Sequence, residues 1–216
     1  MHFEILVEDF SGKTALDILV PKIIGNEHTF QVHSYKGIGR IPNNLKATSD
    51  PQKRILLDQL PRLVRGYGKT FAGYGDYPVA LIVVCDLDSR CLSAFRRELL
   101  DLVDMCNPKP ETYFCIAVEE GEAWYLGDLI AVKKAYPHAK DTILNSYVND
   151  SICDTWEMLA DALFSGGANK LSQLGYQVVG QEKTTWAEKI SPHMDVDNNL
   201  SPSFCYFRDK LRRLTN

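Results

Sequence analysis

The sequence predicts an α/β fold: a three-layer sandwich with a mainly parallel sheet and a helical C-terminal cap. Short apolar runs alternate with segments of helical spacing, which is typical of a sheet covered by helices. The run "VALIVVC" (79–85) is continuously apolar and rich in Val, as in a strand covered on both faces. Strand signals stop after Pro137. We therefore expect one domain over 1–216, with an α/β core at 1–137 and a helical extension at 138–216.

Four segments carry the strand pattern. The first is the short apolar run "FEILV". In the second, apolar and polar residues alternate, so that Phe30 and Val32 share one face of the strand. The last two are continuous apolar runs, which are typical of buried strands. The strands are expected at 3–7, 29–35, 79–85 and 113–118.

The segments between and after the strands have helical spacing. In "CLSAFRRELLDLVDMC", for example, Leu92, Phe95 and Leu99 fall on one stripe. Proline limits or bends the first two helices at Pro21 and Pro61. Helices are expected at 11–24, 52–68, 91–106, 121–136, 154–164, 184–194 and 203–214.

Composition narrows the class of protein. The net charge is −4 and 24% of residues are charged, so bulk attraction to nucleic acid or to an anionic membrane is not indicated, although a local basic groove is compatible. No apolar stretch reaches the length of a membrane span, and the N-terminus lacks the features of a signal peptide. Six cysteines show no CxxC spacing, which disfavours zinc and suggests a reducing compartment. We expect a cytoplasmic protein without membrane contact; a homo-oligomer is compatible with the sequence.

Two aspartates end the third predicted strand, in "VVCDLD". Side chains alternate along a strand, so Asp86 and Asp88 would point the same way and Leu87 the other way. Such a pair is tolerated around a cation, and Mg²⁺ commonly takes one or two carboxylates. The alternative is that these residues cap the following helix, as Asp often does.

Acids also follow two of the other strands. Glu8 and Asp9 come after the first strand, and Glu119, Glu120 and Glu122 come after the last. In open parallel sheets, ligands bind at the carboxyl edge. One or two Mg²⁺ or Mn²⁺ ions there would polarise a phosphodiester, activate water and stabilise the leaving oxygen. The catalytic and metal-binding cluster is expected to consist of Glu8, Asp86, Asp88 and Glu122.

The first predicted strand ends in Glu, in "ILVE" (5–8), and a later one ends in DxD, in "VVCDLD" (83–88). This arrangement resembles that of the Toprim fold, which is found in primases, topoisomerases, OLD-family nucleases and small ribonucleases. Over nearly its whole length, the chain resembles a bacterial family of Toprim-like proteins of unknown function, related to the Toprim domains of OLD-type nucleases. The segments that carry this resemblance are "LVED.SGKTALDILVPKI", "RLVRGYG", "IAVEEGEAWYLGD" and "SPHMDVDNNLSPSFCYFRDKL".

The resemblance implies a Mg²⁺-dependent nuclease, acting on DNA or RNA, that works with an ABC-type or OLD-type ATPase in phage defence. By position, Glu8 would be the general acid/base or metal-linked glutamate, Asp86 and Asp88 would be metal ligands, and Glu122 would be a further acid. The supporting residues would be Asp9, Lys13, Glu119 and Glu120.

This chain departs from the usual Toprim pattern next to the first glutamate. Many Toprim proteins have Gly directly after it and an acid four residues after it, where this chain has Asp9 and Gly12. The departure motivates a second hypothesis, a non-catalytic Toprim-derived module that binds a partner ATPase. A third is a phosphatase of the haloacid-dehalogenase type, which "DLDSR" resembles, although that family carries DxD on its first strand.

Two basic segments have alternative interpretations. In "KGIGR", Lys36, Gly37, Gly39 and Arg40 would cradle a phosphate or nucleic acid through backbone N–H groups, or simply form a turn. Five cations along one helical segment would track a phosphate backbone, or form an ordinary solvated helix face. They are Lys53, Arg54, Arg62, Arg65 and Lys69.

Overall fold

A computed structural model describes residues 1–46, 50–151 and 154–216. Its centre is a sheet of four parallel strands in the order β2-β1-β3-β4. The strands are β1 (His2–Val7), β2 (Thr29–Ser34), β3 (Val79–Asp86) and β4 (Thr112–Ala117). The predicted α/β class and parallel sheet are confirmed, and all four strands lie within one residue of the expected bounds.

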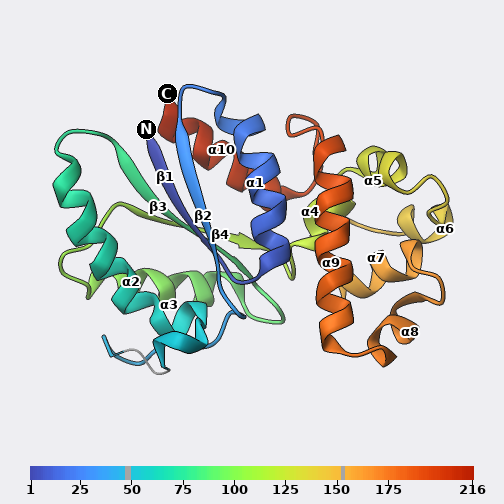
Figure 1. Cartoon of the computed structure of the whole chain (residues 1–216), viewed down its shortest axis with the longest axis horizontal. Coiled ribbons are helices and arrows are strands. Elements are labelled where there is room, and N and C mark those ends of the chain that lie inside the picture. The colour runs from blue at the N-terminus through green and yellow to red at the C-terminus, as the bar shows by residue number, and fades with distance from the viewer. Residues whose placement is uncertain (47–49, 152–153) are drawn as a thin grey trace.

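Helices cover both faces of the sheet and make the three layers (Figure 1). Alternation along β1 sends Phe3, Ile5 and Val7 into one core and Leu6 into the other. The first core lies under α1 (Phe10–Ile24) and α10 (Pro202–Thr215), and the second under α2 (Leu56–Phe71) and α3 (Leu92–Asp104).

The remaining helices follow β4 and lie beside the α1 layer (Figure 1). They are α4 (Glu122–Leu126), α5 (Leu129–Ala135), α6 (Asp141–Leu144), α7 (Thr155–Leu163), α8 (Gly167–Gln173) and α9 (Tyr176–Ile190). Helix α9 packs against α1, and α10 returns to pack against β4 and α1. Trp186 of α9 and Phe204 of α10 are fully buried in the same core as Phe3. The last helix is therefore part of the sandwich.

The predicted helix at 121–136 is wrong as a single element. It is divided into α4 and α5, because Asp128 accepts a hydrogen bond from the Ala131 amide (2.9 Å) and caps a new helix. A side chain at Gly127 would meet the backbone of Ser201 at 2.8 Å, so the break is also a site of close packing.

Other helix bounds differ from the expectation. The helix predicted at 184–194 starts earlier, at Tyr176, and ends at Ile190 before a 3-10 turn at Ser191–His193. Short helices α6 and α8 were not expected. Pro21 and Pro61 lie inside α1 and α2, which both continue through them.

Five cysteines are free thiols, while Cys153 lies outside the described residues. None of the helices within residues 1–46, 50–151 and 154–216 combines the length and the apolar character that a membrane crossing needs.

A polar cluster on the α2 side of the sheet gives a pH-dependent prediction. Glu4 lies 2.6 Å from His33 and 3.3 Å from His2. Burial acts to raise the pKa of Glu4, but the two histidines outweigh it, and the pKa lies below the ordinary value of 4.5. A lowered carboxyl pKa stabilises the fold above the unfolded-state pKa, and this contribution is lost as pH falls through the folded-state pKa.

We expect Glu4→Gln to lower the free energy of unfolding by about 1 kcal/mol near neutral pH. The difference from wild type should shrink as pH falls below the ordinary carboxyl pKa, and it should vanish once Glu4 is protonated in the folded state as well. Urea unfolding at several pH values measures it. A difference that persists unchanged in acid would contradict the assigned charge interaction.

Candidate functional site

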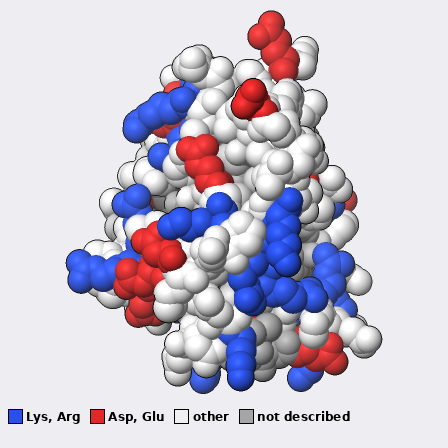
Figure 2. All heavy atoms as spheres, turned by 90° about the vertical axis from the view of Figure 1, so that its left-hand side faces the viewer, with Lys and Arg blue, Asp and Glu red and all other residues white. Residues whose placement is uncertain are grey.

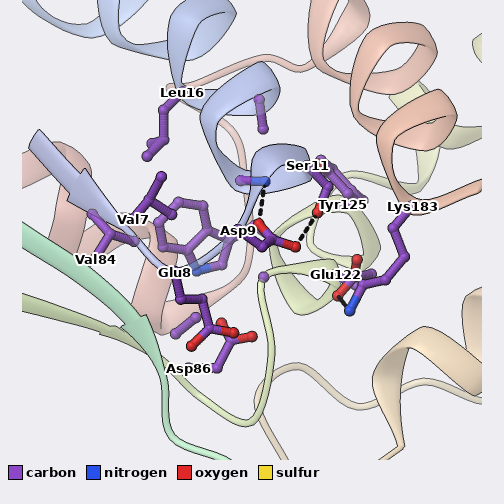
Figure 3. A pocket seen from close by; sticks show the side chains of 15 residues that line it. Val7, Glu8, Asp9, Ser11, Leu16, Val84, Asp86, Glu122, Tyr125 and Lys183 are labelled. Carbon is purple, nitrogen blue, oxygen red and sulfur yellow. Dashed lines mark hydrogen bonds and ion pairs between the residues drawn. The ribbon is translucent and has the colours of Figure 1, made fainter. Parts of the chain in front are cut away.

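A small pocket lies at the carboxyl edge of β1 and β3 (Figure 3). Because Val7 pairs with Val84 across two parallel strands, both strands end at the same edge. Glu8 directly follows β1, and Asp86 is the last residue of β3. The pocket holds about 40 Å³, which suffices for a cation or a water molecule.

The carboxyl groups of Glu8 and Asp86 point toward each other (Figure 3), and each affects the pKa of the other. Burial raises the pKa of Glu8, and burial together with the charge of Glu8 holds the pKa of Asp86 well above its usual range. Within the described chain, Glu8 Oε2 is buried without a hydrogen-bond partner. Two facing carboxyls with an unsatisfied oxygen fit a site that holds a proton or a cation.

Glu122 lines the same pocket but has a partner. It lies in the first turn of α4, and its carboxylate is 3.1 Å from the Lys183 ammonium of α9. Lys183 also lies 3.7 Å from Glu120. Although burial opposes its charge, the surrounding carboxylates hold the pKa of Lys183 well above its usual value. Burial raises the pKa of Glu120 to about 7.

Lys183 is the site residue that sequence reasoning missed. It lies in the middle of a helix, in "GQEKTTW", 61 positions after Glu122, and no motif marks it. Only the packing of α9 against α1 brings it to the edge of the sheet.

Asp88 lies outside the pocket lining, and the predicted strand geometry at 86–88 is wrong. Strand β3 ends at Asp86, and Asp88 has a left-handed φ of 51°, with its amide donating to the Glu119 carbonyl at 3.0 Å. Its half-exposed carboxylate lies 3.5 Å from Arg90. The negative charge of Asp88 still contributes to the raised pKa of Glu8, so Asp88 is a carboxylate near the pocket.

Asp9 serves the start of α1. It accepts hydrogen bonds from the Gly12 amide (2.7 Å) and the Ser11 hydroxyl (2.5 Å), which is the geometry of a helix cap. A side chain at Gly12 would meet Val7 at 2.7 Å, so the close approach of helix and strand requires glycine there. Lys13 pairs with Asp17 on the same helix at 2.8 Å and does not line the pocket.

Glu119 and Glu120 hold the start of α7. Glu119 accepts hydrogen bonds from the Asp154 amide and from the Thr155 amide (2.8 Å), and Glu120 accepts one from the Trp156 amide (3.2 Å). These amides lie at a helix N-terminus, where a carboxylate is favoured. The expected supporting role is thus structural for Glu119, while Glu120 also contacts Lys183.

We expect Glu119→Ala to lower the free energy of unfolding by about 1–2 kcal/mol, because two amides of α7 lose their acceptor. Divalent-metal affinity should change little, since Glu119 does not line the pocket. Chemical denaturation and a Mn²⁺ titration measure the two quantities. A loss of metal affinity without loss of stability would contradict this assignment.

Three of the five amides in the loop "KGIGR" donate hydrogen bonds inside the protein. Gly37 donates to the Glu8 carbonyl (2.8 Å), Lys36 to the Arg54 carbonyl (2.8 Å) and Arg40 to Asp58 (2.9 Å). Gly37 and Gly39 have φ of 105° and 73°, which glycine adopts without strain. This favours the turn interpretation over a phosphate cradle.

The predicted cluster of four carboxylates is only partly assembled. Among residues 1–46, 50–151 and 154–216, no group of three or more His, Cys, Asp or Glu side chains is arranged to hold a metal ion. Glu8 and Asp86 supply two facing hard-oxygen groups. This set fits Mg²⁺ or Mn²⁺, since Mg²⁺ is commonly held by one or two carboxylates with waters and substrate phosphates completing its shell.

In comparisons with known protein families, with curated proteins and with solved structures, nothing matches the chain. The fold and the site define an α/β protein with a paired-carboxylate pocket at the carboxyl edge of its parallel sheet.

Proposed function

We propose that the chain is a metal-dependent phosphodiesterase that acts on DNA or RNA and binds Mg²⁺ or Mn²⁺ through Glu8 and Asp86. One observation carries the proposal: two facing, partly buried carboxyls lie at the ends of adjacent parallel strands, and the buried Oε2 of Glu8 has no hydrogen-bond partner within the described chain. Carboxyl groups with strongly shifted pKa values that lie together in a pocket are typical of functional sites.

A divalent ion held there would polarise a phosphodiester, generate a nucleophilic hydroxide and stabilise the leaving oxygen. The chain's own residues have separate tasks. Glu8 and Asp86 would hold the ion through their carboxylate oxygens. Lys183 pairs with Glu122 and places a positive charge on the pocket wall, where a phosphate oxygen would benefit from it.

The resemblance to Toprim-like proteins supports the same chemistry and adds a biological setting. By that resemblance, the chain would be the effector of a phage-defence system and would work in the cytoplasm with an ATPase partner. Copurification of the chain with the product of a neighbouring ATPase gene would test this setting.

A second candidate is a non-catalytic module that binds an ATPase. It is favoured by the pairing of Glu122 with Lys183, which leaves two carboxylates rather than three for a metal. A DxD phosphatase is less well supported, because Asp86 faces Glu8 whereas Asp88 lies beside Arg90, so the two aspartates do not face one reacting phosphate.

Calorimetric titration with Mn²⁺, combined with cleavage of labelled DNA and RNA, separates these candidates. We expect wild type to bind Mn²⁺ and to cleave, and Glu8→Gln to do neither. Asp104→Asn, at an exposed carboxylate outside the pocket, is the matched control and should behave as wild type. Metal binding without turnover would favour the ATPase-binding module, and absence of metal binding would overturn the proposal.

A further inference from the structure

A larger groove opens beside the carboxylate pocket. It encloses about 910 Å³, and Glu8, Asp9, Ser11 and Lys183 line both hollows. Its walls come from the start of α1, the loop that follows β2, and α9. A ligand that lies in this groove therefore contacts Glu8 and adjoins the small pocket that Asp86 lines.

Aromatic side chains line the groove and two of them are strongly exposed. Tyr176, at the start of α9, is 89% exposed, and Phe10, at the start of α1, is 60% exposed. Tyr35 and Trp156 also line it and are partly buried. Exposed aromatic groups gathered in one groove indicate a binding surface, and aromatic rings are the platforms on which unpaired bases stack.

The rim of the groove at Tyr35 is positively charged. The guanidinium of Arg54 lies 5.7 Å from the centre of the Tyr35 ring, and the charges of Arg54 and Arg62 both act on the Tyr35 hydroxyl. Lys36 lines the groove next to Tyr35. Cations at the edge of an aromatic groove are the complement of a phosphate backbone.

The positive surface continues from this rim onto α2. Arg62 also lines a second hollow of about 350 Å³, together with Arg65 and Lys69. Figure 2, which views the molecule from the left-hand side of Figure 1, shows Lys and Arg side chains gathered in the centre of the lower half, with Asp and Glu side chains to either side. The net charge of the chain is −4, so this concentration of cations is a local feature.

We infer that the groove binds single-stranded nucleic acid, with bases on Phe10 and Tyr176 and phosphates along Lys36, Arg54 and Arg62. The inference rests on the proposed function and specifies its substrate. In a duplex the base faces are stacked on one another and not available to protein aromatic rings, whereas an unpaired strand offers one face per nucleotide. The strand would pass from the α2 face into the groove and bring a phosphodiester to Glu8 and Asp86.

Fluorescence anisotropy in EDTA tests binding without metal or cleavage. The probes are labelled oligo-dT and oligo-U of about 12 nucleotides and a duplex of the same length. We expect both single strands to bind more tightly than the duplex, and the ratio between them to distinguish a DNA site from an RNA site. Phe10→Ala and Tyr176→Ala should each weaken single-strand binding roughly 5- to 100-fold. Tyr77→Ala, at an exposed tyrosine outside the groove, is the matched control and should bind as wild type.

The contribution of the basic side chains to strand binding is measured by the dependence of affinity on salt concentration. Arg62→Gln should weaken binding and reduce the slope of log affinity against log salt by about 0.7. Lys134→Gln, on α5, should leave the slope unchanged. Circular dichroism confirms that each variant is folded.

Duplex binding as tight as single-strand binding, unaltered affinity in the Phe10→Ala Tyr176→Ala double variant, or no strand binding by wild type would each overturn the inference. These outcomes differ from failure of the proposed function. If the chain binds Mn²⁺ at Glu8 and Asp86 but does not bind the single strand, the proposed metal site holds and the groove inference fails. If it binds the single strand but not Mn²⁺, the groove inference holds and the proposed metal site fails.

Discussion

Replacing Asp86 with Asn is expected to eliminate cleavage and to weaken Mn²⁺ affinity at least about 100-fold, without unfolding the chain. Loss of groups that merely orient metal ligands already costs 10–100-fold in other metal sites, so loss of one of two carboxylate ligands should cost more. The same replacement removes a carboxyl whose pKa is held well above its usual range by burial and by the charge of Glu8. Wild-type stability near neutral pH therefore includes an unfavourable contribution that Asn lacks.

We accordingly expect the midpoint of thermal unfolding of Asp86→Asn to equal or exceed that of wild type in metal-free buffer. Calorimetric titration and differential scanning calorimetry on the same protein give both quantities. Asp104→Asn, at an exposed position, is the control for a change of one charge. Retention of metal affinity by Asp86→Asn, or its failure to fold, would contradict the functional assignment.

Replacing Lys183 with Met is expected to cause a large loss of stability, about 3–5 kcal/mol. The ammonium lies 3.1 Å from Glu122, whose side chain is only 4% exposed, and 3.7 Å from Glu120. Without Lys183 the buried Glu122 and the partly buried Glu120 lose the ammonium that lies between them, and they must either remain ionised at high cost or bind protons. Urea unfolding near neutral pH measures the loss.

A double variant separates the ion pair from simple packing. Glu122→Gln in the Lys183→Met background removes the uncompensated charge and should recover part of the lost stability, as coupled neighbours do. Lys133→Met breaks an exposed pair with Asp141 and should cost at most about 1 kcal/mol. If the double variant is no more stable than Lys183→Met, the buried charge is not the cause of the loss.

The strands could be predicted from sequence because their signal is local. The continuous apolar run of β3 and the alternation of β2 each require burial on defined faces, and no distant residue is needed to recognise them. The break between α4 and α5 could not be predicted from hydrophobic spacing, because it depends on the cap at Asp128 and on contact between Gly127 and residues near Ser201.

Only part of the candidate site could be predicted from the sequence. Glu8 and Asp86 meet because parallel strands end at one edge, which is a property of the fold class. The placement of Asp88 depends on a left-handed turn that a DxD spacing does not reveal. Lys183 depends on a long-range helix contact, and the pairing of Glu119 with α7 likewise joins segments 35 and 36 residues apart. Sequence reasoning identified the acids but could not say which of them a helix terminus or a lysine would engage.

The central claim is that Glu8 and Asp86 together hold one divalent cation. Anomalous diffraction from a crystal of the wild-type chain soaked in Mn²⁺ tests it most directly. The account predicts a peak between the two carboxyls at the ends of β1 and β3, and no such peak in Asp86→Asn. A peak that lies elsewhere, or carboxyls that stay paired with each other in saturating Mn²⁺, would contradict it.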